Sequence, residues 1–159
     1  MLPENKLYPK PSEKPQLYVF SCSDETQDES LERNLIGAKT DWALKVIPGN
    51  YCFLLNYSPP EKTLLGLFRV SSRCKYNLVK NAWGGMFPYQ VKIEMASSEI
   101  RKCPLTKFSH IIVDRKSQRV QNIIEGVSVG ECLKIFEESA LIYPGKIKNL
   151  EKNRRVPGN

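Results

Sequence analysis

Residues 88–95 alternate between apolar and polar side chains with the period of a β-strand, and this pattern constrains the fold more than any other feature. Val91, Ile93 and Met95 fall on one side of such a strand, as expected where one face is buried. Two further apolar runs, 51–57 and 63–71, are joined by a loop that contains two prolines. The middle of the chain therefore predicts an antiparallel pair followed by a half-buried strand.

Helices are predicted nearer the two ends. Residues 23–38 have a helical pattern, with Ser23 or Asp24 as the cap and Gly37 as the stop signal. Residues 128–139 predict a second helix, with Ser128 and Glu131 at the spacing of a capping box. This order indicates an α+β fold, in which a curved mixed sheet or a small β-barrel has helices packed around it.

Shorter elements are expected in the remaining segments. The pattern predicts a strand at 17–22, a short helical stretch at 42–46 and a turn at 47–50. A further strand is expected at 108–114 and an extended segment at 119–125.

The first and last residues differ in composition from the rest. Residues 1–15 hold four of the eleven prolines and predict an extended arm, whereas residues 144–159 form a basic tail. The domain is therefore expected over 16–143. The longest apolar run is too short to cross a membrane, and the N-terminus has charges and prolines where a signal peptide is apolar. A cytoplasmic protein without a membrane partner is expected.

The charge balance favours a polyanionic partner. The chain has 24 Lys and Arg residues against 17 Asp and Glu, a net charge of +7. The charge is unevenly placed, because Asp24–Glu32 is acidic whereas 101–119 and the C-terminal tail are basic. A surface of this kind attracts nucleic acid, although the same excess also serves solubility.

Catalytic and metal-binding patterns are missing from the sequence. The five cysteines never fall in a CxxC pair, which argues against both a disulfide framework and a thiolate zinc site. The single histidine, His110, lies in an apolar stretch without a catalytic motif around it, and the glycines at 84 and 85 lack the Lys-Ser or Lys-Thr of a phosphate loop. We therefore expect a protein that is not an enzyme and has no cofactor or metal.

Five blocks of the chain resemble a known RNA-reading family. In order and at similar spacing, LYVFSCSDETQDESLERNLIGA, TLLGLFRVSS, NAWGGMFPYQVKIEM, EIRKCPLTKFSH and SQRVQNIIEGVSVGECLKIF are similar to the YTH domain, which is PUA-like. The resemblance covers about residues 16–137. The stretches SLERNLIGA, PGNYCFLLNY and AWGGMFPYQV also resemble the plant DCD domain, a related PUA-like module. We expect a stand-alone domain of prokaryotic or archaeal type.

The resemblance implies a function and a set of site residues. YTH domains hold a flipped-out adenine with an N6-methyl group in an aromatic cage, beside basic residues that contact the RNA backbone. Trp83 matches a cage wall, Ser21 a serine that lines the pocket, and Arg119 a phosphate contact. The alternative for Trp83 is that its ring only covers the core. The family therefore implies binding of single-stranded RNA.

At other positions the chain departs from the family. Ile36 and Leu78 replace aromatic residues of the pocket, and Gly37, next to Ile36, is expected at the same pocket. Thr26 stands where the family has an Asn or Asp that recognises the adenine edge. The expected result is RNA binding with weak preference for the methylated base. Trp42 is an alternative wall, although its place in a short helix favours the core. The alternative function is a DCD-like regulatory module that binds proteins or a small ligand.

Overall fold

A nine-stranded mixed sheet organises residues 16–143, which are the residues that the computed structural model describes. The expected N-terminal arm (1–15) and basic tail (144–159) lie outside the described residues. The strands are β1 (Leu17–Cys22), β2 (Leu35–Ala38), β3 (Tyr51–Asn56), β4 (Thr63–Val70), β5 (Lys75–Tyr76), β6 (Tyr89–Met95), β7 (Arg101–Pro104), β8 (Ile123–Ile124) and β9 (Leu141–Ile142). β1 and β3 run parallel, and the other paired strands run antiparallel. The fold is α+β, as the sequence predicts, with an open sheet.

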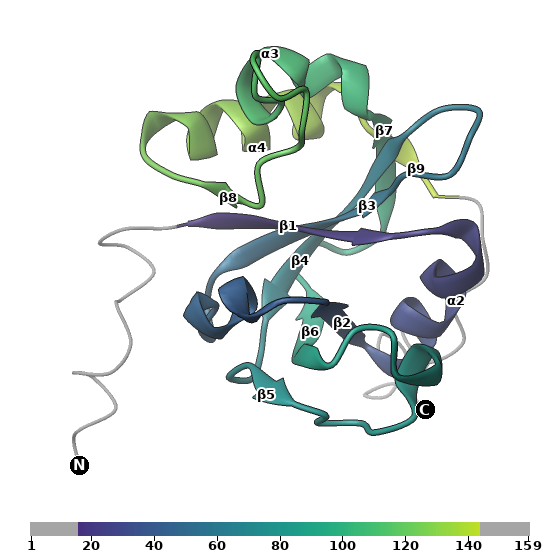
Figure 1. Cartoon of the computed structure of the whole chain (residues 1–159). Coiled ribbons are helices and arrows are strands. Elements are labelled where there is room, and N and C mark those ends of the chain that lie inside the picture. The colour runs from purple at the N-terminus through teal and green to yellow at the C-terminus, as the bar shows by residue number, and fades with distance from the viewer. Residues whose placement is uncertain (1–15, 144–159) are drawn as a thin grey trace.

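Helices cover one face of this sheet and one end of it (Figure 1). α3 and α4 lie together over one face, and α2 follows β1 at the end of that strand. The helical elements are α2 (Asp24–Arg33), α3 (Ser109–Ile112), α4 (Val127–Ser139) and the 3-10 turns η1 (Asp41–Lys45), η2 (Ala82–Gly85) and η3 (Leu105–Phe108). None of the helices within residues 16–143 has both the length and the apolar character needed to span a membrane.

The central strands are buried on both faces because they separate two cores. On β1, Tyr18 and Phe20 pack into the core inside the curved sheet, whereas Leu17 and Val19 pack under α3 and α4. β3 divides its side chains in the same way. This arrangement explains why these strands are almost continuously apolar rather than alternating.

The sheet curls so that β2 lies beside β1 without being its hydrogen-bonded neighbour. The order in the described part of the chain is β2-β6-β4-β3-β1-β8, so β2 stands at one end of this path and β1 near the other. The two strands nevertheless contact each other across the curve. Side chains from both strands surround the space between them, and the cavity described below lies there.

The elements with the clearest local patterns are predicted correctly. β3 and β4 form the expected antiparallel pair, β6 is the expected strand, and α4 and η1 lie where helical residues are expected. α4 begins one residue earlier than predicted, with Gly126 rather than Ser128 before its first turn. The extended segment 119–125 contains β8.

Two predicted elements are wrong. The helix expected over 23–38 ends at Arg33, because Asn34 adopts the left-handed conformation (φ 54°) that asparagine tolerates, and residues 35–38 then pair with β6 as β2. The strand expected at 108–114 is helical up to Ile112, and only Val113 forms a β-bridge, with Val120. Phe108 and Ile112 are four residues apart, so a helical turn buries both completely in the core under α4.

Gln90 lies on the predicted polar side of β6, yet it is fully buried. Its side-chain amide donates to the carbonyl oxygens of Phe87 (3.0 Å) and Val79 (3.1 Å), and its oxygen accepts the Val79 N–H at 2.7 Å. Because these three hydrogen bonds replace bonds that the Gln90 amide would otherwise make to water, burying this side chain costs little free energy. Gln90 thus fixes the loop that carries Trp83 and Phe87.

Candidate functional site

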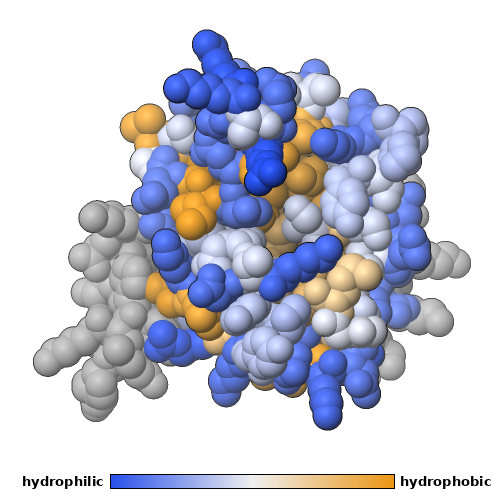
Figure 2. Space-filling view, viewed as in Figure 1, coloured by the Kyte–Doolittle hydropathy of each residue, from blue (hydrophilic) through white to orange (hydrophobic). Residues whose placement is uncertain are grey.

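A cavity of about 350 Å³ lies between β1 and β2. On the face of the molecule seen in Figure 2, apolar surface lies inside a hollow near the centre, with hydrophilic side chains around it. The volume is at the lower end of the roughly 300–1,000 Å³ typical of small-molecule sites. It is lined by Ser21, Gly37, Ala38, Lys39, Thr40, Trp42, Tyr57, Phe87 and Asn122.

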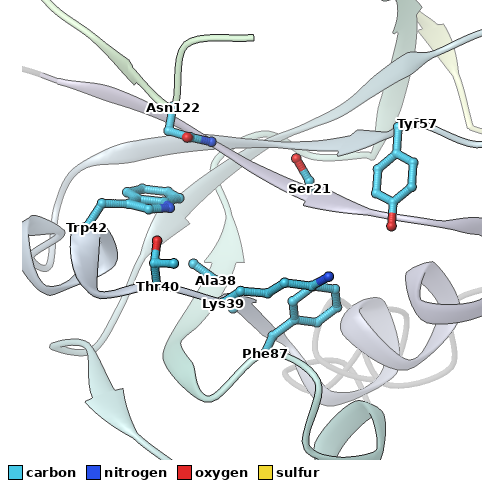
Figure 3. A pocket seen from close by; sticks show the side chains of 9 residues that line it. Ser21, Ala38, Lys39, Thr40, Trp42, Tyr57, Phe87 and Asn122 are labelled. Atoms are coloured by element: carbon cyan, nitrogen blue, oxygen red, sulfur yellow. The ribbon is translucent and has the colours of Figure 1, made fainter. Parts of the chain in front are cut away.

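The lining combines aromatic rings with a few polar groups (Figure 3). Ser21, Tyr57 and Asn122 lie along the β1 side, and Trp42, Thr40, Lys39, Ala38 and Phe87 lie along the opposite side. Flat rings offer stacking surfaces, whereas hydroxyl and amide groups give direction to hydrogen bonds. The cavity is therefore suited to a flat, polar-edged molecule.

Trp42 is held at the cavity by aromatic neighbours from β1. Its ring lies 4.9 Å from that of Phe20 and stacks on Tyr18 at 6.3 Å, measured between ring centroids. The side chain is partly buried, so one part packs on the core while another faces the cavity. The sequence favours the core for Trp42 and leaves a pocket wall as the alternative, and in the structure the side chain contacts both.

Gly37 forms the thin part of the cavity wall. A Cβ atom at this position would lie 2.8 Å from Phe87 Cβ and 2.9 Å from the Phe87 carbonyl oxygen, closer than carbon atoms pack. The absence of a side chain therefore lets Phe87 approach β2. Ser21 and Gly37, both expected at the pocket, line the cavity.

Asn122 contributes an oriented amide. Its Nδ2 donates to the Val19 carbonyl oxygen at 2.9 Å, and the Val19 N–H donates to the Asn122 backbone oxygen at 2.9 Å. These two bonds fix the amide against β1. Its side-chain oxygen, which has no partner of its own among these bonds, can accept a hydrogen bond from a bound molecule.

Trp83 lies behind the cavity wall rather than along it. It is 5% exposed and packs with Leu35, Ala82 and Phe87, and its ring meets that of Phe87 edge to face at 5.3 Å. Its indole N–H donates to Ser30 Oγ at 3.1 Å. Trp83 therefore supports the wall that Gly37 and Phe87 form and does not itself line the cavity, so of the two positions expected for it the structure has the buried one.

The corner that carries Trp83 is strained and is held in place by α2. Trp83 has φ 51°, a left-handed conformation that is unfavourable for a bulky residue and costs of order 1–3 kcal/mol. Its backbone N–H donates to Glu29 Oε2 at 2.8 Å, an oxygen that Arg33 Nε also contacts at 2.8 Å. These contacts from α2 fix both the backbone and the ring of Trp83.

The remaining predicted site residues lie away from the cavity lining. Thr26 is buried, and its hydroxyl oxygen accepts the Ser23 N–H at 2.9 Å at the start of α2. Ile36 is in the inner core, and Leu78 packs against the Trp83 cluster. Arg119 is exposed in the loop between α3 and β8. None of these four side chains is among those that line the cavity.

The lining residues Phe87, Tyr57, Lys39 and Asn122 were missed by the sequence predictions. The local pattern around each is that of an ordinary loop or strand end. They meet only because the sheet curls and brings β2 next to β1, which is a long-range feature.

Cys22, the residue after the cavity-lining Ser21, is a poor nucleophile near neutral pH. Burial, together with the nearby Asp24 carboxylate, raises the pKa of the Cys22 thiol to about 12. The thiol is therefore protonated near neutral pH, and the reactive thiolate is scarce. Cys22 packs as a small apolar residue in the inner core.

The sequence matches the development and cell death (DCD) domain family over residues 16–137. It is also similar to the B2 protein of Daucus carota, with 29% identity over 134 residues. That alignment covers 77% of this chain and 62% of the carrot protein, so the chain spans less than two thirds of that relative.

Solved YTH domains share the fold at low sequence identity. The YTH domain of Zygosaccharomyces rouxii MRB1 protein, in complex with N6-methyladenosine RNA, has a TM-score of 0.58 and 15% identity, covering 82% of this chain and 92% of that one. The Pho92 YTH domain in complex with m6A has a TM-score of 0.59 and 12% identity, with 83% and 91% coverage. The expected prokaryotic or archaeal type of the domain stays a prediction.

Proposed function

Because this chain belongs to the development and cell death domain family and has the fold of YTH domains, we propose that it binds single-stranded RNA and takes one base into the cavity between β1 and β2. The observation that carries the proposal is the cavity itself, in which aromatic rings face oriented polar groups. The net charge of +7 supports it, because the phosphate backbone is a polyanion.

Stacking supplies the first part of the binding free energy. An unpaired base stacked on an aromatic side chain gains about 1–3 kcal/mol. Trp42 offers the largest ring at the cavity, and Phe87 lies on the same side. Their neighbours hold both rings before any ligand arrives, so little conformational entropy is lost on binding.

Hydrogen bonds at the cavity edge give the pocket a preference among bases. The Asn122 amide oxygen accepts an N–H from the base, and the Ser21 hydroxyl donates to a ring nitrogen. Adenine offers this combination, an exocyclic N–H beside a ring acceptor. Lys39 adds a positive charge at the same site for the adjoining phosphate.

The preference for an N6-methyl group is weak in this proposal. Burial of one methyl group contributes about 0.8 kcal/mol, and contact with a ring raises the total to roughly 1–1.5 kcal/mol, about tenfold in affinity. This estimate counts the methyl group against one ring. Ile36 and Leu78, which stand where the family has aromatic cage residues, do not line the cavity and add no contact to it.

A second candidate function is a protein-interaction module, as the DCD resemblance suggests. A separate cavity of about 360 Å³ favours it, because Leu67, Leu133 and Phe136 line it together with charged residues. Mixed apolar and charged surfaces are typical of protein-binding sites. This alternative predicts no salt-dependent RNA binding.

A titration of short single-stranded RNA tests the proposal. Matched RNAs with one adenine, methylated or not, are titrated by fluorescence anisotropy at two salt concentrations. We expect binding at low salt that weakens as salt rises, with a preference of about tenfold or less for the methylated RNA. Absence of binding at low salt would contradict the proposal and favour the interaction module.

A further inference from the structure

Tyr76 is an exposed aromatic residue beside the proposed RNA site. Its side chain is 63% exposed on β5, and its ring meets that of Tyr89 edge to face, with 5.3 Å between centroids. Tyr89 is itself partly buried against the inner core. The contact holds the Tyr76 ring against the protein while most of its surface stays open to solvent.

The strand register places this tyrosine pair next to the cavity. Tyr76 on β5 is directly opposite Tyr89 on β6, and Tyr89 is directly opposite Ala38 on β2. Ala38 lines the cavity. Residues directly opposite one another in adjacent strands point to the same face, and two strand spacings amount to ~10 Å. A short RNA can span this distance.

The end of β5 is also fixed in position. Asn77 adopts a left-handed conformation (φ 54°), and its N–H donates to the Pro88 carbonyl oxygen at 2.7 Å. This bond ties the residue after Tyr76 to the residue before Tyr89. The two rings therefore form a preorganised surface, and little entropy is lost when a ligand stacks on it.

The charge of the surrounding segment suits RNA. From Lys62 to Ile93 the chain contains six basic residues and no acidic one. Lys75, next to Tyr76, is exposed. On the other side of the cavity, α2 carries the acidic run that begins at Asp24. A phosphate backbone is thus attracted toward β5 and repelled from α2.

We propose that Tyr76 stacks a second base, from a nucleotide near the one held in the cavity, so that the protein reads at least two nucleotides. This inference rests on the proposed function, because it extends the same RNA-binding site across β6 to β5. Stacking on an exposed aromatic ring tolerates every base, so the second position contributes affinity rather than sequence preference.

Two RNAs of equal length and charge test the inference. One carries all its bases, and the other keeps only the central adenine because its flanking positions are abasic. We expect Tyr76→Ala to weaken the intact RNA roughly fivefold to a hundredfold and to leave the abasic-flank RNA unchanged. Tyr76→Phe, which keeps the ring, should bind both RNAs as the unaltered protein does.

Control variants separate this inference from the proposed function. Trp42→Ala should weaken both RNAs, and Leu141→Ala, an exposed apolar residue on β9, should change neither. If Tyr76→Ala leaves the intact RNA unchanged, or weakens both RNAs equally, the second stacking position is wrong while the cavity proposal stands. If the unaltered protein binds neither RNA at low salt, the proposed function fails and the inference falls with it.

Discussion

The two tryptophans of this chain occupy neighbouring regions with different physical characters. Trp42 lies on η1, half-buried, with part of its ring at the cavity. Trp83 lies on η2, 5% exposed, with its backbone and its indole N–H both bonded to α2. Both approach the short strand that contains Gly37, from the cavity and from behind it.

The comparison shows how a binding wall is built from two layers. The inner layer, around Trp83, is buried, both N–H groups of Trp83 already have partners on α2, and the layer packs against Phe87 and Gly37. The outer layer, around Trp42, keeps ring surface open. In our account Trp42 therefore contributes mainly to affinity and Trp83 mainly to stability.

The largest expected effect is on stability at the inner layer. Trp83→Ala removes a buried ring and its bond to Ser30, and should lower the free energy of unfolding by about 3–5 kcal/mol. Trp42→Ala removes a half-buried ring and should cost only about 1–2 kcal/mol. Urea denaturation of both variants measures the difference. Equal losses would remove the distinction between the two layers.

The next effect is on RNA affinity at the outer layer. Trp42→Ala should weaken RNA binding by about 1–3 kcal/mol because a stacking surface is lost. Trp83→Phe, which keeps an apolar ring in the buried cluster, should bind with nearly unchanged affinity. Anisotropy titrations on variants shown to be folded by circular dichroism measure both. A larger affinity loss for Trp83→Phe would mean that the indole contacts the ligand.

Gly37 connects the two layers, so its substitution should affect both. A Cβ at Gly37 would lie 2.8 Å from Phe87 Cβ and 3.0 Å from Trp83 Cζ3, and Gly37→Ala should cost about 1–2 kcal/mol of stability through this overlap. Gly130→Ala is the matched control. It lies exposed in α4 with no atom near its Cβ position, and should stabilise by about 0.5–1 kcal/mol. Thermal unfolding measures both variants. A lower melting temperature for Gly37→Ala and a higher one for Gly130→Ala would support the close packing at Gly37, whereas a Gly37→Ala melting temperature equal to that of the unaltered protein would contradict it.

The smallest effect is expected from Arg119, outside both layers. Arg119 is exposed in a loop, so Arg119→Ala should leave stability unchanged. If it contacts a phosphate, the slope of log affinity against log salt should fall by ~0.7. A slope identical to that of the unaltered protein would show that Arg119 is an ordinary solvated charge.

The sequence predicts the elements whose patterns are local. β6 alternates, and α4 has an apolar stripe, so both were predicted with nearly correct bounds. Residues 35–38 continue the helical spacing of α2 and so were misassigned, because a single left-handed Asn34 ends the helix. Phe108 and Ile112 lie in an apolar run that is compatible with a strand or a helix, and only the core beneath them decides.

The candidate site was less predictable than the fold. Ser21 and Gly37 were placed at a pocket through the family resemblance, and both line the cavity. Asn122 and Phe87 are far from them in sequence and meet them only when the sheet has curled. The resemblance placed Trp83 at the pocket wall, and the helical pattern favoured the core for Trp42. The sequence alone does not show that Gln90 and Glu29, from other elements, fix the loop that buries Trp83.

Tryptophan fluorescence of single-tryptophan variants tests the central claim most directly, because the chain has only two tryptophans. Trp83→Phe leaves Trp42 as the fluorophore, and Trp42→Phe leaves Trp83. The account predicts that a short single-stranded RNA quenches or shifts the emission of Trp42 and leaves that of Trp83 nearly unchanged, with binding of both variants confirmed by anisotropy. A response confined to Trp83, with Trp42 unaffected, would contradict the account and place the base at the corner rather than in the cavity.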